Sequence, residues 1–167
     1  MHAAISREPR RSHGEGAREG SRDESVSLWL RLLASHNLML AELRKRLATK
    51  CSLARFDLLA NLDREDGQTL ASLSRRMLVT AGNLTGLVTR AERDGVVQRR
   101  PDPADKRLSR VWLTKKGQKL VRELVPVHAE HVAELTRGLD ADSRRALRSL
   151  LGRLKDSLST LPKDATP

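Results

Sequence analysis

The chain has 167 residues and is strongly basic, with 32 Lys and Arg against 21 Asp and Glu and a net charge of +11. This length suits one domain with a sizeable core, and the excess positive charge predicts an anionic partner. Between Leu43 and Arg122 lie 19 Lys and Arg against 8 Asp and Glu, so this segment accounts for the whole net charge. We therefore expect the partner to bind there.

Aromatic residues are limited to Trp29, Trp112 and Phe56, with no tyrosine. Proteins that bind single-stranded nucleic acid stack bases on aromatic side chains, so duplex DNA is the expected partner. No apolar run reaches the roughly 18 residues of a membrane span and no signal peptide is evident, which predicts a cytoplasmic protein without a membrane role. The single cysteine, Cys51, provides neither a disulfide nor a multi-cysteine zinc site.

Enzymatic function is not indicated by any segment of the chain. We find no nucleophile elbow, P-loop, zinc signature or dinucleotide fingerprint, and we expect no catalytic residue and no cofactor. His128 and His131 are three residues apart, but no further ligand is positioned to complete a metal site with them.

The N-terminal part contains a tail and a long helix. Residues 1–23 are rich in Gly, Ser and Arg, which predicts a disordered tail. Residues 24–50 follow a helical pattern that is apolar over a wide arc, including Trp29 and Leu40. Such a helix is buried on more than one side. We expect it to contact both its own domain and a second copy of the chain.

Residues 51–113 predict three helices followed by a β-hairpin. The third helix follows an N-cap at Thr80, and its apolar stripe opposes small residues that include Gly82 and Thr85. A helix with a small-residue face fits the DNA major groove, about 12 Å wide, although packing on another helix is the alternative. Two strand-like runs, residues 96–100 and 108–113, flank a PDPADK loop. The predicted fold is mainly α with a small β-hairpin wing, a winged helix-turn-helix.

The C-terminal part predicts two further helices and a tail. Thr114 caps a long helix, Asp140 caps a last helix with a leucine stripe, and residues 161–167 form a tail. Two-fold dimers bind two DNA half-sites, and terminal helices often supply the pairing. We therefore assign residues 24–50 and 114–160 to dimerisation. The alternative is that these helices complete the core of a monomer.

Four segments together resemble the MarR family of bacterial transcription regulators. They read LARFDLLANL, LASLSRRMLVTAGNLTGLVTRAERDGVV, RRPDPADKR and VWLTKKGQKL. The resemblance covers about Leu28 to Leu158, and its most specific motif is Asp105-x-Arg107 followed by Leu113-Thr114 and Gly117. It implies an obligate homodimer with entwined terminal helices, a DNA-binding helix and wing in each lobe, and no enzymatic activity.

The resemblance also implies which residues contact DNA. Arg107 would enter the minor groove, whose negative potential attracts arginine, and Asp105 would hold it. Thr80, Gly82, Asn83 and Thr85 fall where the family places its base and phosphate contacts. The basic candidates are Arg75, Arg76 and Arg90, which would position the helix through phosphates, and Lys106 at the wing tip.

The segments LWLRLL, RFDLL and MLVTAGNLTGLV resemble regulators of aromatic-compound catabolism. This implies an effector pocket between the dimerisation helices and the DNA-binding lobe, for a phenolic acid or an aromatic acyl-CoA. The candidate residues are Arg31, His36, Arg44 and Phe56, with an arginine pairing a carboxylate or phosphate. Each of them has an alternative role as an ordinary surface or core residue.

The leading hypothesis is a ligand-responsive dimeric repressor that binds a pseudo-palindromic operator. One alternative is an architectural DNA-binding protein with little sequence preference. Another is a peroxide-sensing regulator that uses Cys51, because nearby Arg44, Lys45, Arg46 and Lys50 would lower the pKa of the thiol.

Overall fold

The computed structural model describes residues 13–161; the outer parts of both predicted tails, residues 1–12 and 162–167, lie outside the described residues. The chain forms two compact units, and the boundary between them lies between Glu42 and Leu43. Helix α1 (His13–Leu47) begins in the first unit and ends in the second. It begins well before residue 24, so the predicted tail is too long. A helix nucleated by its apolar turns gains one hydrogen bond for each residue added.

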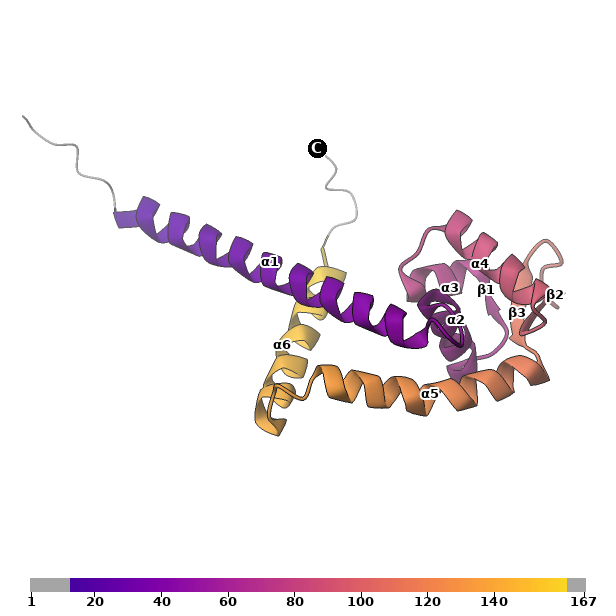
Figure 1. Ribbon diagram of the computed structural model, residues 1–167. Helices are drawn as coiled ribbons and strands as arrows, with labels where there is room; N and C mark the ends of the chain where they lie inside the picture. Colours follow the sequence, from indigo (N-terminus) through magenta and orange to yellow (C-terminus); the bar gives the residue numbers. More distant parts are fainter. Residues whose placement is uncertain (1–12, 162–167) are drawn as a thin grey trace, which may run out of the picture. The chain divides into compact units, whose positions relative to one another are not determined.

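The second unit contains a winged helix-turn-helix, which confirms the predicted fold class (Figure 1). Its three-stranded antiparallel sheet has the order β1-β3-β2, with Gln68 opposite Val111 and Arg100 opposite Arg110. The sequence analysis missed the two-residue strand β1. The elements are α2 (Leu53–Arg64), β1 (Gln68–Thr69), α3 (Leu70–Met77), α4 (Ala81–Arg93), β2 (Val97–Pro101), β3 (Ser109–Leu113), α5 (Lys115–Leu135) and α6 (Ala141–Ser159).

Helices α2, α4, α5 and α6 begin at polar N-caps, and the sequence analysis predicts those at Thr80, Thr114 and Asp140. The side chains of Ser52, Thr80, Thr114 and Asp140 each accept a hydrogen bond from the backbone N–H three residues later. Such a cap stabilises a helix by about 1 kcal/mol. At the other end of α4, Gly95 takes a φ of 72°, a left-handed conformation that glycine adopts at no steric cost.

The hydrophobic core lies between α2, α3, α4, the sheet and the first half of α5, and we call these elements the winged-helix lobe. Its largest fully buried side chains are leucines and valines, including Leu58, Leu84 and Val111. Gly117 fixes how α5 joins it. A Cβ at this position would lie 2.0 Å from the carbonyl oxygen of Val96, so only glycine allows so close an approach.

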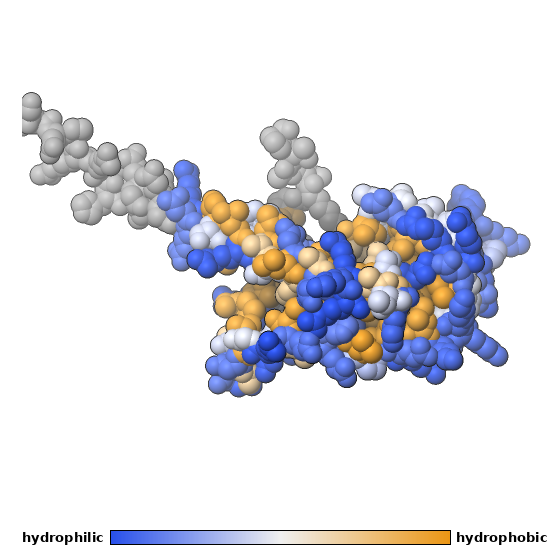
Figure 2. Space-filling view, viewed as in Figure 1, coloured by the Kyte–Doolittle hydropathy of each residue, from blue (hydrophilic) through white to orange (hydrophobic). Residues whose placement is uncertain are grey.

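Outside the lobe many large apolar side chains are exposed, although Leu43 and Leu47 at the end of α1 are buried. All of α6 is described, and none of its residues is buried. Its leucine stripe is exposed by 37–58% (Figure 2). In the first unit, Trp29 is 60% exposed. Within residues 13–161 no helix is both long and apolar enough to cross a membrane.

Candidate nucleic-acid interface

The face of α4 opposite the core is open. Leu84 and Val88 are fully buried in the lobe, whereas Gly82, Asn83 and Thr85 are exposed. A Cβ added at Gly82 would meet no atom of the described chain within 4 Å. The first turn of α4 can therefore approach another surface closely.

The threonine hydroxyls on this face donate within the helix. Thr85 Oγ1 donates to the carbonyl of Ala81 at 2.9 Å, and Thr89 Oγ1 donates to the carbonyl of Thr85 at 2.9 Å. Their single hydroxyl protons are therefore engaged. Thr85 retains its oxygen lone pairs and its methyl group for a partner, which suits a base amino group or the methyl group of thymine.

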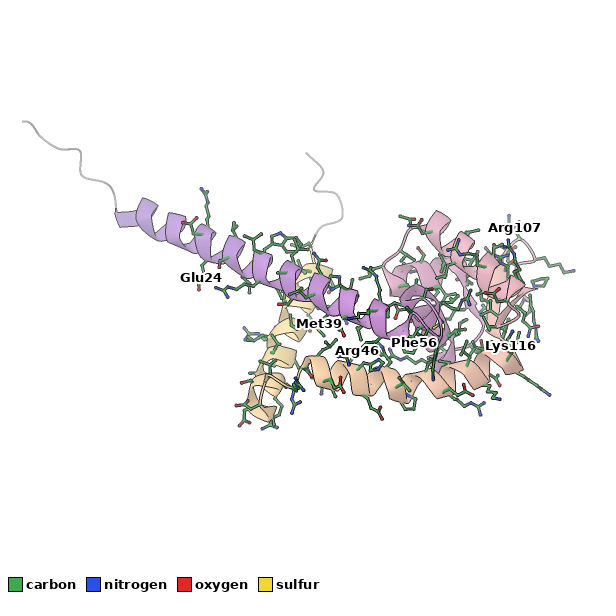
Figure 3. All side chains as sticks on the ribbon, viewed as in Figure 1. Glu24, Met39, Arg46, Phe56, Arg107 and Lys116 are labelled. Atoms are coloured by element: carbon green, nitrogen blue, oxygen red, sulfur yellow. The ribbon has the colours of Figure 1, made fainter. Side chains whose placement is uncertain are left out.

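Arg107 is exposed at the wing and held by Asp105, as the family resemblance implies (Figure 3). One carboxylate oxygen of Asp105 accepts from the backbone N and Nε of Arg107, and the other accepts from Nη2, all at 3.0 Å. These bonds lower the pKa of Asp105 below its ordinary value. Although its side chain is 90% exposed, Arg107 is oriented by a two-pronged contact.

Asp102 organises the base of the wing loop, a role that the sequence analysis did not assign. It is only 4% exposed, and its carboxylate accepts from the backbone N–H groups of Ala104 at 2.7 Å and Asp105 at 3.1 Å. It also pairs with Arg110, whose Nη1 donates to the carbonyl of Gly67 at 2.9 Å. Hydrogen bonds from Ala104 and Arg110 lower the pKa of Asp102. The sequence did contain a signal for this role, because an aspartate at the start of a loop often accepts a hydrogen bond from the backbone N–H two residues later.

The basic candidates have different surroundings. Arg75 and Lys106 are exposed, but Arg76 pairs with Glu65 across the lobe surface. A Cβ at Gly86 would lie 3.4 Å from Arg90 Nη1, so the guanidinium of Arg90 covers this part of α4. Arg75 is therefore a stronger candidate for a phosphate contact than Arg76.

Phe56 lines a cavity of about 400 Å³ between α2 and α5. Its ring lies 4.4 Å from that of His128, measured between centroids, and Figure 3 shows Phe56 beside α5. The Nδ1 atom of His128 is buried and has no hydrogen-bond partner among residues 13–161, an arrangement that a ligand or water would satisfy. The other lining residues are Asp57, Ala60, Asn61, Asp63, Arg64, Val125 and Ala129.

The remaining predicted effector residues are not part of this cavity wall. Arg44 is exposed in the second unit and does not line the cavity. Arg31 and His36 belong to the first unit and are exposed there. His128 was missed because its contact with Phe56 joins residues 72 positions apart, which no local pattern reveals.

Cys51 does not have the surroundings of a reactive thiol. It is buried, and burial raises the pKa of its thiol, although the charge of Arg55 acts in the opposite direction. The prediction that the flanking basic residues lower this pKa is wrong. Lys45 and Lys50 are exposed and Arg46 pairs with Glu134, whereas the thiol is buried, where a thiolate is poorly solvated.

Comparisons with known proteins identify the fold and the family. The MarR family model matches residues 51–109. The regulator PecS of Dickeya dadantii is 30% identical over 112 residues, which span 65% of this chain and 68% of PecS. The chain belongs to the MarR family. YkoM of Bacillus subtilis, an uncharacterised regulator, is 36% identical over 50% of this chain and 54% of its own length, so the chain spans about half to two thirds of these curated relatives.

Solved structures extend the MarR-family match beyond the lobe. A mutant of Escherichia coli MarR in complex with operator DNA has a TM-score of 0.73 and 27% identity over 79% of this chain and 96% of that one. AbsC of Streptomyces coelicolor has a TM-score of 0.74 at 22% identity over 83% of this chain and 97% of its own, a likeness of fold. The winged helix of this chain is therefore the DNA-binding fold of a family of transcription regulators.

Proposed function

We propose that the protein is a dimeric, ligand-responsive transcriptional repressor that binds a pseudo-palindromic DNA operator. In each lobe α4 would enter the major groove, and Arg107 would enter the adjacent minor groove. One observation carries this proposal: the same lobe presents an open small-residue helix face and an arginine held in place on its wing. Dimerisation is typical of the family, and a structural neighbour, a mutant of Escherichia coli MarR, was solved in complex with operator DNA, which supports operator DNA as the partner.

We infer that the effector binds in the α2–α5 cavity. A volume of about 400 Å³ suits a small aromatic acid or the acyl part of an aromatic acyl-CoA, with Phe56 and His128 as an aromatic wall. One structural neighbour motivates this class, because the DNA binding of BpsR is regulated by 6-hydroxynicotinic acid, and a second neighbour, PcaV, was solved with its natural ligand. Release of DNA requires that the effector favour a conformation in which the two α4 helices no longer match successive grooves.

The DNA-binding proposal is tested with the best duplex selected from a random library and an unrelated duplex of equal length. Arg107→Ala should weaken binding to the selected duplex by roughly 1–3 kcal/mol and alter the preference at minor-groove positions. Lys106→Ala, an equal charge change in the same loop, should weaken both duplexes alike. Equal effects of the two variants would contradict the assigned role of Arg107. Weak binding without sequence preference would favour an architectural protein.

The effector proposal is tested by titrating the protein–DNA complex with phenolic acids, 6-hydroxynicotinic acid and aromatic CoA thioesters. At least one compound should release the wild-type protein from the DNA, and release of the His128→Gln variant should require a higher concentration of that compound. If none releases the DNA, the proposed effector class is wrong. Peroxide treatment of the same complex tests Cys51, and unchanged DNA affinity would remove the redox alternative.

A further inference from the structure

Arg99 of β2 connects the wing to α4. Its backbone N–H donates to Oε1 of Glu92, and its Nη1 donates to Oε2 of the same carboxylate, both at 2.9 Å. Its Nη2 donates to Thr89 Oγ1 at 2.9 Å and to the carbonyl of Thr85 at 3.3 Å. One residue of the wing therefore makes four hydrogen bonds to the helix that bears the candidate base contacts.

The position of Arg99 in the sheet explains this reach. Arg99 pairs with Val111, which is buried against the core, so both side chains lie on the side of the sheet that faces α4. Arg110, which pairs with the neighbouring Arg100, reaches instead to Asp102 and Gly67. The two arginines therefore bind from opposite faces of the wing. Arg99 contacts α4, and Arg110 contacts the turn before β1.

The contacts of Arg99 end on the exposed stretch of α4. Thr89 and Thr85 are exposed, and the Arg99 side chain is 27% exposed, so water competes only in part for its bonds. A guanidinium that spans a carboxylate, a hydroxyl and a carbonyl has its orientation fixed by several acceptors at once. The wing and α4 therefore meet at an angle defined by specific contacts in addition to apolar packing.

We propose that Arg99 is a positioning residue that, with Glu92 and Thr89, fixes the angle between α4 and the wing. This fixed angle lets α4 and Arg107 engage neighbouring grooves of one duplex at the same time. The inference rests on the proposed DNA-binding function. It assigns to Arg99 a role in sequence discrimination without a contact to a base.

Glu92→Gln tests this role because the two possible effects have opposite signs. Removing a negative charge from a DNA-binding surface strengthens binding to every duplex when only charge matters. Loss of the Arg99 anchor should instead weaken binding to the selected duplex about tenfold and leave binding to the unrelated duplex unchanged or tighter. Glu123→Gln, the same charge change on an exposed residue of α5, serves as the control and should not weaken either. A tighter complex of Glu92→Gln with the selected duplex would overturn the proposal.

Arg99→Gln and Arg99→Lys provide a second measurement. If Arg99 neutralised a phosphate, Arg99→Gln would lower the slope of log affinity against log salt by about one ion. The positioning role predicts loss of footprint protection at the wing, with any fall in the slope coming from the lost contacts of Lys106 and Arg107, and no rescue by lysine, which lacks the planar fork. Circular dichroism confirms that each variant is folded. A reduced slope together with an intact wing footprint would contradict the positioning role of Arg99. If the wild-type protein selected no duplex, the proposed DNA-binding function and this role would both be overturned.

Discussion

The leucines of the winged-helix lobe and those of helix α6 differ in burial. In the lobe, Leu58, Leu62 and Leu84 are completely buried, and the elements around them are joined by side-chain contacts such as those of Asp102 and Arg99. In α6 the leucines form an equally regular stripe, yet all of them remain exposed. The lobe is complete within one chain, whereas α6 has an apolar face that only a further surface can cover.

This difference separates the folding of the lobe from the association of two chains. A DNA-binding lobe with its own core keeps α4 and the wing in register without help from a partner. A helix with an uncovered leucine stripe is unfavourable in water by about 25 cal/mol for each Å² of apolar surface, and pairing with a second copy would recover that free energy. Changes in the lobe should therefore alter folding, and changes in the α6 stripe should alter association.

The largest expected effect is that of Leu151→Asp in the α6 stripe. A symmetric dimer loses two buried leucines, so its dissociation free energy should fall by roughly 3–6 kcal/mol, while the lobe stays folded. Sedimentation velocity measures the association, and circular dichroism measures the fold. Ser149→Asp adds the same charge on the opposite face of the helix and should leave the dimer intact. An unchanged dimer in Leu151→Asp would show that α6 is not the interface.

A pair of glycine substitutions compares the two regions directly. Gly117→Ala should destabilise the lobe by roughly 1–3 kcal/mol, because the new methyl group meets the carbonyl of Val96. Gly152→Ala in α6, where a Cβ meets no atom of the described chain within 4 Å, should raise helix stability by about 0.5–1 kcal/mol. Urea unfolding of both variants provides the test. Equal effects would mean that the close approach of α5 to β2 is not required.

Much of this fold could be predicted from the sequence because the signals are local. The caps Ser52, Thr80 and Thr114 each act within one turn of helix, and the PDPADK loop marks the wing by its own composition. The pair Asp105 and Arg107 lies two residues apart, so a motif alone was sufficient to find it.

The missed features depend on residues distant in sequence. Strand β1 has two residues and exists because it pairs with β3, more than 40 positions later. The ion pair of Arg76 with Glu65 and the burial of Cys51 likewise follow from tertiary packing. No periodicity or motif within a short window specifies such contacts.

The smallest expected effect concerns pH and is confined to the junction of α2 with α5. Burial lowers the pKa of His128 below its ordinary 6.5, and the charge of His131 acts in the same direction, whereas Asp57 opposes them. The unfolded chain therefore binds this proton first. The unfolding free energy should decline as pH falls below about 6.5, until the folded imidazole is also protonated. Urea unfolding at several pH values should show a smaller decline in His128→Gln, and an identical decline would contradict the assignment to this residue.

The chain has two tryptophans and no tyrosine, one tryptophan in each unit. Trp29 is largely exposed, whereas Trp112 lies against Gly67, with the guanidinium carbon of Arg100 5.6 Å from its ring centroid. Intrinsic fluorescence therefore contains two separable signals. Self-association that covers Trp29 would shift its emission to shorter wavelength, and DNA at the wing would alter the quenching of Trp112. In Trp29→Phe the wing becomes the sole emitter, and its occupancy can be followed without an added label.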